Sequence, residues 1–170
     1  MKQEPLSRSA EAESVATRKH AANENLDFGP LASWIGFHLR LAQTASFHAF
    51  CTEAREIDLS PGRFATLMLI GRNPGISQTA LAAANGRDKS TLTPILEDLD
   101  RRGFVQREKM KTDRRSYQLT LTPAGKKMLD ELTACAKRHD DNLDRIVGPK
   151  DRAKFLKTLQ KIAAEMGGKE

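Results

Sequence analysis

The chain has 170 residues, a net charge of +6 and an isoelectric point near 9.5. This length argues for one domain, or one domain with appendages. The basic balance favours a polyanionic partner, and the alternative is a soluble protein that is simply basic. No apolar run approaches the roughly 20 residues of a membrane helix, and the polar opening MKQEPLSRSAEAES does not resemble a signal peptide. We therefore expect a cytoplasmic protein that does not associate with membranes. Its two cysteines are too few for a disulfide framework.

The first part of the chain divides at Gly29-Pro30. Residues 1–27 carry mixed charge and few large apolar side chains, which is typical of a flexible tail. Residues 31–51 then show helical periodicity with apolar side chains on two sides. Because such a helix must be covered twice, we expect it to pack against its own domain and against a second copy of the chain.

Two short helices are predicted next, each with a clear start signal. Ser60-Pro61 is an N-cap followed by a proline at the first helical position, and Ser77 caps the following alanine-rich helix. Between them, Asn73-Pro74-Gly75 is typical of a tight turn. Asn85-Gly86 ends the second helix.

A third helix of this group has an ambiguous start. Its apolar residues Leu92, Ile95, Leu96 and Leu99 recur at helical spacing, and Gly103 closes it. If the helix begins at Asp88, Pro94 removes the hydrogen bond to the Ser90 carbonyl. If it begins near Ser90 or Thr91, Pro94 falls in the first turn at little cost. We assign Pro94 no contact with a base.

A β-hairpin follows. Phe104–Arg107 and Tyr117–Leu121 are predicted strands, and the second alternates apolar with polar residues. Thr122-Pro123 begins a long helix that stops at Gly148-Pro149, and a last helix carries apolar residues from Phe155 to Met166. The predicted fold is therefore mainly α with a small β-hairpin.

Two helices around a tight turn, followed by a hairpin, form a winged helix-turn-helix. Short hydroxyl side chains at a helix N-terminus suit base edges and phosphates, and a basic hairpin tip suits the minor groove. The alternative is a hairpin tip that is merely solvated. The candidate DNA contacts lie at the start of the second helix or on the hairpin: Lys89, Ser90, Thr91, Thr93, Lys109, Lys111, Arg114 and Arg115.

Two segments carry a family resemblance, DKSTLTPILEDLDRRGFVQRE (88–108) and DRRSYQLTLTPAG (113–125). They resemble the multiple-antibiotic-resistance regulator (MarR) family of bacterial winged-helix repressors. Asp113 and Arg115 match the Asp-x-Arg signature of the family's wing. The resemblance implies that Arg115 reaches the minor groove and that Arg114 contacts the DNA backbone. It also implies that Asp113 orients the arginines or pairs with another basic residue.

The resemblance also implies a homodimer. Residues 28–58 and 123–170 would supply the dimerisation helices, and residues 59–122 would form the DNA-binding lobe, all within one domain. One lobe covers few base pairs. A two-fold dimer reads two half-sites about one helical turn apart, so an inverted-repeat operator is expected.

Many MarR-family regulators are released from DNA by an aromatic acid or an acyl-CoA thioester bound between these two parts. By this resemblance, the candidate ligand-binding residues are Trp34, His38, Arg40, Phe64 and Met68. The alternatives are core packing for Trp34, a hydrogen-bonded interface histidine for His38 and a surface arginine for Arg40. We expect no metal and no cofactor.

The sequence also leaves room for functions other than a ligand-released repressor. Cys51 could sense peroxide, although Glu53 rather than a cation is its neighbour, and Cys135 lies on an apolar face. A winged-helix module that binds protein is a further alternative. The common phosphate-loop, nucleophile-elbow, zinc-protease and dinucleotide motifs are missing, so we do not expect an enzyme.

Overall fold

A computed structural model describes residues 26–54, 57–86, 88–109 and 117–167. The chain forms two compact units, residues 1–43 and 44–170. Nearly all of the predicted tail lies outside the described residues, as do Lys111, Asp113, Arg114 and Arg115.

The first unit contains the 3₁₀ helix η1 (Gly29–Ser33) and the beginning of helix α2 (Ile35–Glu53). Between them Trp34 is extended, with ψ 122°, and its carbonyl accepts hydrogen bonds from the amides of Phe37 and His38. The helix predicted over 31–51 is therefore split. Trp34 precedes α2 because its dihedral angles are not helical, while its carbonyl already accepts a hydrogen bond from the first turn of the helix.

In the second unit, helix α3 (Pro61–Arg72) and helix α4 (Gln78–Ala84) begin where the sequence predicts. The Ser60 hydroxyl accepts from the Arg63 amide at 3.5 Å, and the Ser77 hydroxyl accepts from the Ala80 amide at 3.2 Å. Satisfying these amides fixes both helix starts locally.

Helix α5 (Lys89–Arg101) starts at the earlier of the two predicted positions, because Asp88 is its N-cap. Pro94 therefore lies inside the helix, where the amide that would bond the Ser90 carbonyl is missing. Gly103 ends the helix with φ +71°, and the Phe104 amide reaches back to the Leu99 carbonyl at 2.9 Å. This is a Schellman-type end, which needs a left-handed residue where glycine stands.

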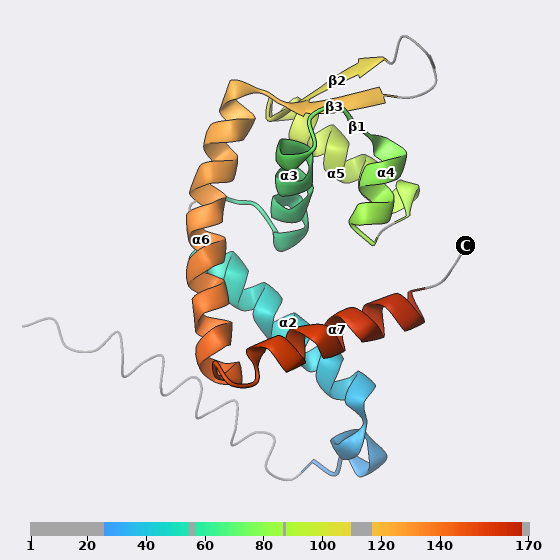
Figure 1. The fold of residues 1–170 in the computed structure, drawn as a ribbon, viewed down its shortest axis with the longest axis vertical. Helices are drawn as coiled ribbons and strands as arrows, with labels where there is room; N and C mark the ends of the chain where they lie inside the picture. Colours follow the sequence, from blue (N-terminus) through green and yellow to red (C-terminus); the bar gives the residue numbers. More distant parts are fainter. Residues whose placement is uncertain (1–25, 55–56, 87, 110–116, 168–170) are drawn as a thin grey trace, which may run out of the picture. The chain divides into compact units, whose positions relative to one another are not determined.

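The hairpin is part of a three-stranded antiparallel sheet in the order β1-β3-β2. Strand β2 is Val105–Lys109, strand β3 is Tyr117–Leu121, and the two-residue strand β1 is Ile76–Ser77. Leu119 faces Ile76 on one side and Arg107 on the other. Figure 1 shows α3, α4 and α5 gathered beside this sheet. Sequence reasoning missed β1, since two residues show no periodicity.

Helix α6 (Pro123–Val147) follows β3 directly, and helix α7 (Arg152–Met166) follows the turn at Gly148. Thr122 caps α6 by accepting from the Gly125 amide at 3.0 Å, and its hydroxyl donates to the Gly103 carbonyl at 2.6 Å. A Cβ on Gly125 would come 1.9 Å from the Phe104 carbonyl oxygen, so this close approach admits glycine alone.

The core of the second unit is mainly aliphatic. Its fully buried large residues include Leu67, Ile70, Leu81, Leu92, Leu96, Leu99, Val105, Leu119 and Leu132. By contrast, α7 buries none of its residues. None of the helices in the described ranges combines the length and hydropathy that crossing a bilayer requires.

Candidate nucleic-acid interface

The start of α5 presents a hydrogen-bonded cluster around Asp88. Its carboxylate accepts from the Ser90 hydroxyl (2.6 Å), the Thr91 amide (2.6 Å) and the Thr91 hydroxyl (3.1 Å). The Ser90 hydroxyl and then the two Thr91 donors lower the pKa of Asp88 to about 2. Asp88 is therefore ionised at neutral pH. Lys89, Ser90 and Thr91 are all exposed, which suits their predicted contact with DNA.

Thr93 lies differently from its neighbours. It is half-buried, its hydroxyl donates to the Lys89 carbonyl at 2.8 Å, and it accepts from Gln78 Nε2 at 3.0 Å. Gln78 is the first residue of α4, and sequence reasoning did not single it out. The contact joins residues that are 15 apart in the chain, so no local pattern announces it.

The base of the wing combines a cation with an aromatic ring. Arg107 of β2 holds its guanidinium carbon 5.0 Å from the centre of the Tyr117 ring, within cation–π range, and Nη2 donates to Gln78 Oε1 at 3.4 Å. Lys109 is exposed at the end of β2, where it pairs with Tyr117 in the sheet. Of the basic wing residues predicted to contact DNA, Lys109 is the one that lies within the described residues.

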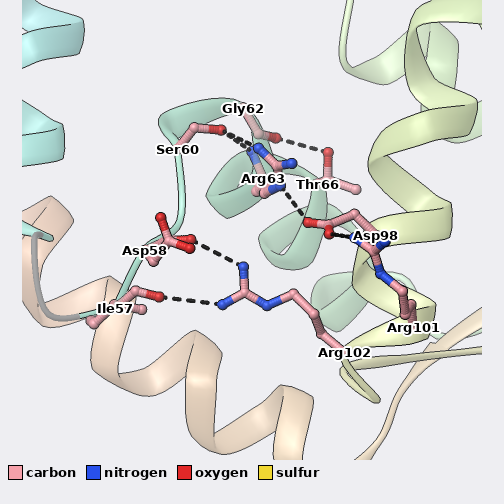
Figure 2. Close-up of polar contacts among 9 residues, drawn as sticks. All are labelled: Ile57, Asp58, Ser60, Gly62, Arg63, Thr66, Asp98, Arg101 and Arg102. Carbon is pink, nitrogen blue, oxygen red and sulfur yellow. Dashed lines mark hydrogen bonds and ion pairs between the residues drawn. The ribbon is translucent and has the colours of Figure 1, made fainter.

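The other end of α5 is tied to α3 and to the residues just ahead of α3 (Figure 2). Arg63 Nε donates to the Asp98 carboxylate at 2.8 Å, and Arg101 Nη2 donates to it at 2.5 Å. Burial works against ionisation of Asp98, but the hydrogen bonds from Arg101 and Arg63 outweigh it and lower its pKa. The bond from Arg63 therefore links α3 to the last part of α5.

Arg102 adds a second tie at this end. It donates to the backbone carbonyls of Asp58 (3.0 Å) and Ile57 (3.5 Å), as Figure 2 also shows. Asp58 has φ +50°, a left-handed conformation that is uncommon outside glycine. The guanidinium therefore holds a sharp turn against the end of α5.

The predicted ligand-binding residues are distributed over both units. Trp34, His38 and Arg40 belong to the first unit, where His38 Nε2 bonds the Ala32 carbonyl at 2.8 Å and Arg40 lies 5.2 Å from the Phe37 ring. Phe64 and Met68 belong to the second and are half-buried, with Phe64 5.8 Å from the Phe50 ring.

Two cavities in the second unit have other linings. A cavity of about 440 Å³ is bounded by α3, β3 and α6, and one of about 270 Å³ lies at the start of α3 beside Cys51 and Arg63. Neither is lined by the five predicted ligand-binding residues. Those five residues stay a prediction.

Comparison with known proteins decides the family. The MarR family model matches residues 59–117, which covers α3, α4, α5 and β2. The proposed transcriptional regulatory protein for the hcr operon of Thauera aromatica is 32% identical over 152 residues, which are 85% of this chain and 92% of that protein. The chain belongs to the MarR family.

Solved structures of related repressors are similar to this chain in both sequence and fold. The transcriptional repressor CouR bound to a 23-mer DNA duplex is 33% identical, with a TM-score of 0.76 over 82% of this chain and 99% of that one. CouR bound to p-coumaroyl-CoA is 30% identical, with a TM-score of 0.75 over 82% and 98% of the two chains. As a MarR-family member, the chain is a DNA-binding transcriptional regulator and not an enzyme, as the sequence predicts. Family membership therefore favours DNA, rather than another protein, as the partner of the winged helix.

Proposed function

We propose that the protein is a homodimeric repressor that leaves its operator when an aromatic carboxylate or its CoA thioester binds. The observation that carries the proposal is the likeness to one relative, CouR, in two states. That repressor was solved with a DNA duplex and with p-coumaroyl-CoA, and this chain covers at least 98% of it in both structures. Coverage of almost the whole relative and a similar fold support the same pair of ligand classes here.

Exposed apolar side chains support the dimer. On α7, Phe155 and Leu156 are 47% and 40% exposed, and Met166 is 81% exposed, as is Ile146 near the end of α6. A helix with this much uncovered apolar surface needs a partner. We infer that residues 28–58 and 123–170 make the dimer and that residues 59–122 form the DNA-binding lobe. The expected operator is an inverted repeat.

DNA recognition is assigned to α5 and the wing. Lys89, Ser90 and Thr91 stand exposed at the N-terminus of α5, where backbone amides and the helix dipole favour a phosphate or a base edge. Arg115 would enter the minor groove, with Arg114 on the backbone and Asp113 orienting them. Lys109 and Lys111 add charge at the wing.

Fluorescence anisotropy with the DNA upstream of the gene tests the DNA-binding assignment. Affinity is expected to fall roughly a thousandfold between 50 and 200 mM salt, because several phosphate contacts release counterions. Arg115→Ala is expected to weaken binding about tenfold, the scale of one lost groove contact. Lys137→Ala on α6 removes the same charge outside the lobe and should leave affinity unchanged. Unchanged affinity in Arg115→Ala would remove the wing from the interface.

The inducer is tested by adding aromatic acids and their CoA thioesters to the preformed complex. Release by one class, with no release by CoA alone, is the expected result. Trp34→Ala and Phe64→Ala should then raise the ligand concentration needed to release the DNA. Neither variant should change the affinity for DNA when no ligand is present. Sedimentation of the free protein as a monomer at micromolar concentration would contradict the dimer.

A thiol sensor is the second candidate, and one contact favours it. Arg138 Nη2 lies 3.2 Å from Cys135 Sγ, so a guanidinium stands beside a thiol that the sequence placed on an apolar face. Cys135 is only 7% exposed, however, which limits the access of an oxidant to its sulfur. Release of DNA by peroxide in the wild type but not in Cys135→Ser, with no effect of aromatic ligands, would establish this function instead.

A further inference from the structure

A chain of hydrogen bonds links the wing to the recognition helix α5. Arg107 Nη2 on β2 donates to Gln78 Oε1 (3.4 Å), and Gln78 Nε2 on α4 donates to Thr93 Oγ1 (3.0 Å). The Thr93 hydroxyl then donates to the Lys89 carbonyl (2.8 Å). Gln78 therefore joins three elements of the winged helix, because it lies on α4 and bonds one residue of β2 and one of α5.

The direction of this chain is fixed by its two ends. Arginine has donors and no acceptor, so the Gln78 amide must turn its oxygen toward Arg107 and its NH₂ toward Thr93. A backbone carbonyl can only accept, so the Thr93 hydroxyl turns its proton toward Lys89. With the proton committed there and the Gln78 amide against its oxygen, Thr93 has no hydrogen to donate to a base.

Contacts on two sides hold the Arg107 guanidinium in the position from which it donates to Gln78. Its Nε is buried without a hydrogen-bond partner among the described residues, and its guanidinium carbon lies 5.0 Å from the centre of the Tyr117 ring. Placing an unpartnered donor out of water is unfavourable. That Arg107 is nevertheless held between the Tyr117 ring and Gln78 indicates that its task is to orient the Gln78 amide.

We propose that Thr93 reads the operator through its methyl group and so selects a thymine in each half-site. In the major groove the C5-methyl of thymine is the apolar group that distinguishes it, and a threonine methyl is a matching contact. Gln78 and Arg107 are positioning residues that keep the Thr93 oxygen turned inward. The inference rests on the proposed function, in which α5 contacts DNA, and it places the start of α5 in the major groove.

A deoxyuridine scan of the operator tests the inference. Deoxyuridine pairs like thymidine but lacks the methyl group, so it removes this contact and leaves base pairing intact. At one thymine per half-site, wild-type affinity is expected to fall roughly fourfold, which corresponds to about 0.8 kcal/mol for a buried methyl-sized group. Thr93→Ser should bind the thymine operator that much more weakly and be indifferent to deoxyuridine. Thr93→Val, which keeps a methyl, should retain the thymine preference.

The positioning role has its own readout, the ratio of thymine to deoxyuridine affinity. Arg107→Met frees the Gln78 amide to turn, so this ratio should approach one even where the protein stays folded. Lys109→Met on the same strand removes an equal charge outside the chain of bonds. It should lower overall affinity and keep the ratio. An unchanged ratio in Arg107→Met would remove Arg107 from the inference.

Two outcomes would overturn the proposal. In one, no thymine in the operator is sensitive to loss of its methyl. In the other, Thr93→Ser keeps the discrimination and Thr93→Val loses it, which would make the hydroxyl the reading group. The deoxyuridine scan uses the wild-type protein, so the first outcome does not depend on whether any variant folds. Failure of that protein to bind any duplex would instead contradict the proposed function.

Discussion

The bond between Arg63 and Asp98 is expected to stabilise the lobe by about 1–2 kcal/mol. A hydrogen bond to a charged group contributes roughly 1.5–3 kcal/mol when shielded from water. The Asp98 side chain is 15% exposed but that of Arg63 is 35% exposed, so solvent screening reduces the value. Arg101 is 78% exposed and adds little. Asp98→Ala should therefore lower Tm by about 3–6 °C at fixed protein concentration.

A double-mutant cycle measures the free energy of interaction between Arg63 and Asp98. Asp98→Ala, Arg63→Met and the double variant are unfolded in urea, and a coupling free energy near 1 kcal/mol is expected. Asp141→Ala breaks the exposed Lys137–Asp141 pair, whose side chains are 74% and 57% exposed, and should change stability by less than about 0.5 kcal/mol. Additive effects of Asp98→Ala and Arg63→Met would refute the reasoning.

The pH dependence has a definite sign. Because the pKa of Asp98 is lowered from 3.8 on folding, its contribution is present above that value and is lost as pH falls toward the folded pKa. The stability difference between wild type and Asp98→Asn should therefore be largest near pH 7 and shrink below pH 4. A difference that grows on acidification would contradict the assignment.

Further predictions concern the caps and the close contact at α6. Gly125→Ala should cost about 3 kcal/mol or more in urea unfolding, because its Cβ would lie 1.9 Å from the Phe104 carbonyl oxygen, whereas Gly36→Ala has open space and should be neutral or slightly stabilising. Asp88→Ala should lower Tm through loss of the α5 cap, and Asp88→Asn, which keeps one acceptor oxygen but not the charge, should melt between wild type and the alanine variant at pH 7. The Asp88 contribution should also fade as pH drops from 3.8 toward 2, measured as Tm against pH with the alanine variant as reference.

The candidate site was predictable where the chemistry is local to the chain. The exposed face near the start of α5 follows from the spacing of Leu92, Leu96 and Leu99, which turn the other face inward. The roles of Gln78 and Arg107 were not predictable, because their contacts depend on how β2, α4 and α5 pack. Long-range polar contacts leave no periodic signal in a sequence.

The sequence by itself determined the helix starts at Ser60, Ser77 and Thr122, the hairpin and the family, because capping, turns and alternation act between near neighbours. Only the tertiary structure decided that α5 begins at Asp88 with Pro94 inside it, since packing of its leucines outweighs one lost hydrogen bond. It likewise decided that Ile76 and Ser77 form a third strand, because a strand this short exists only where β3 offers hydrogen-bonding partners.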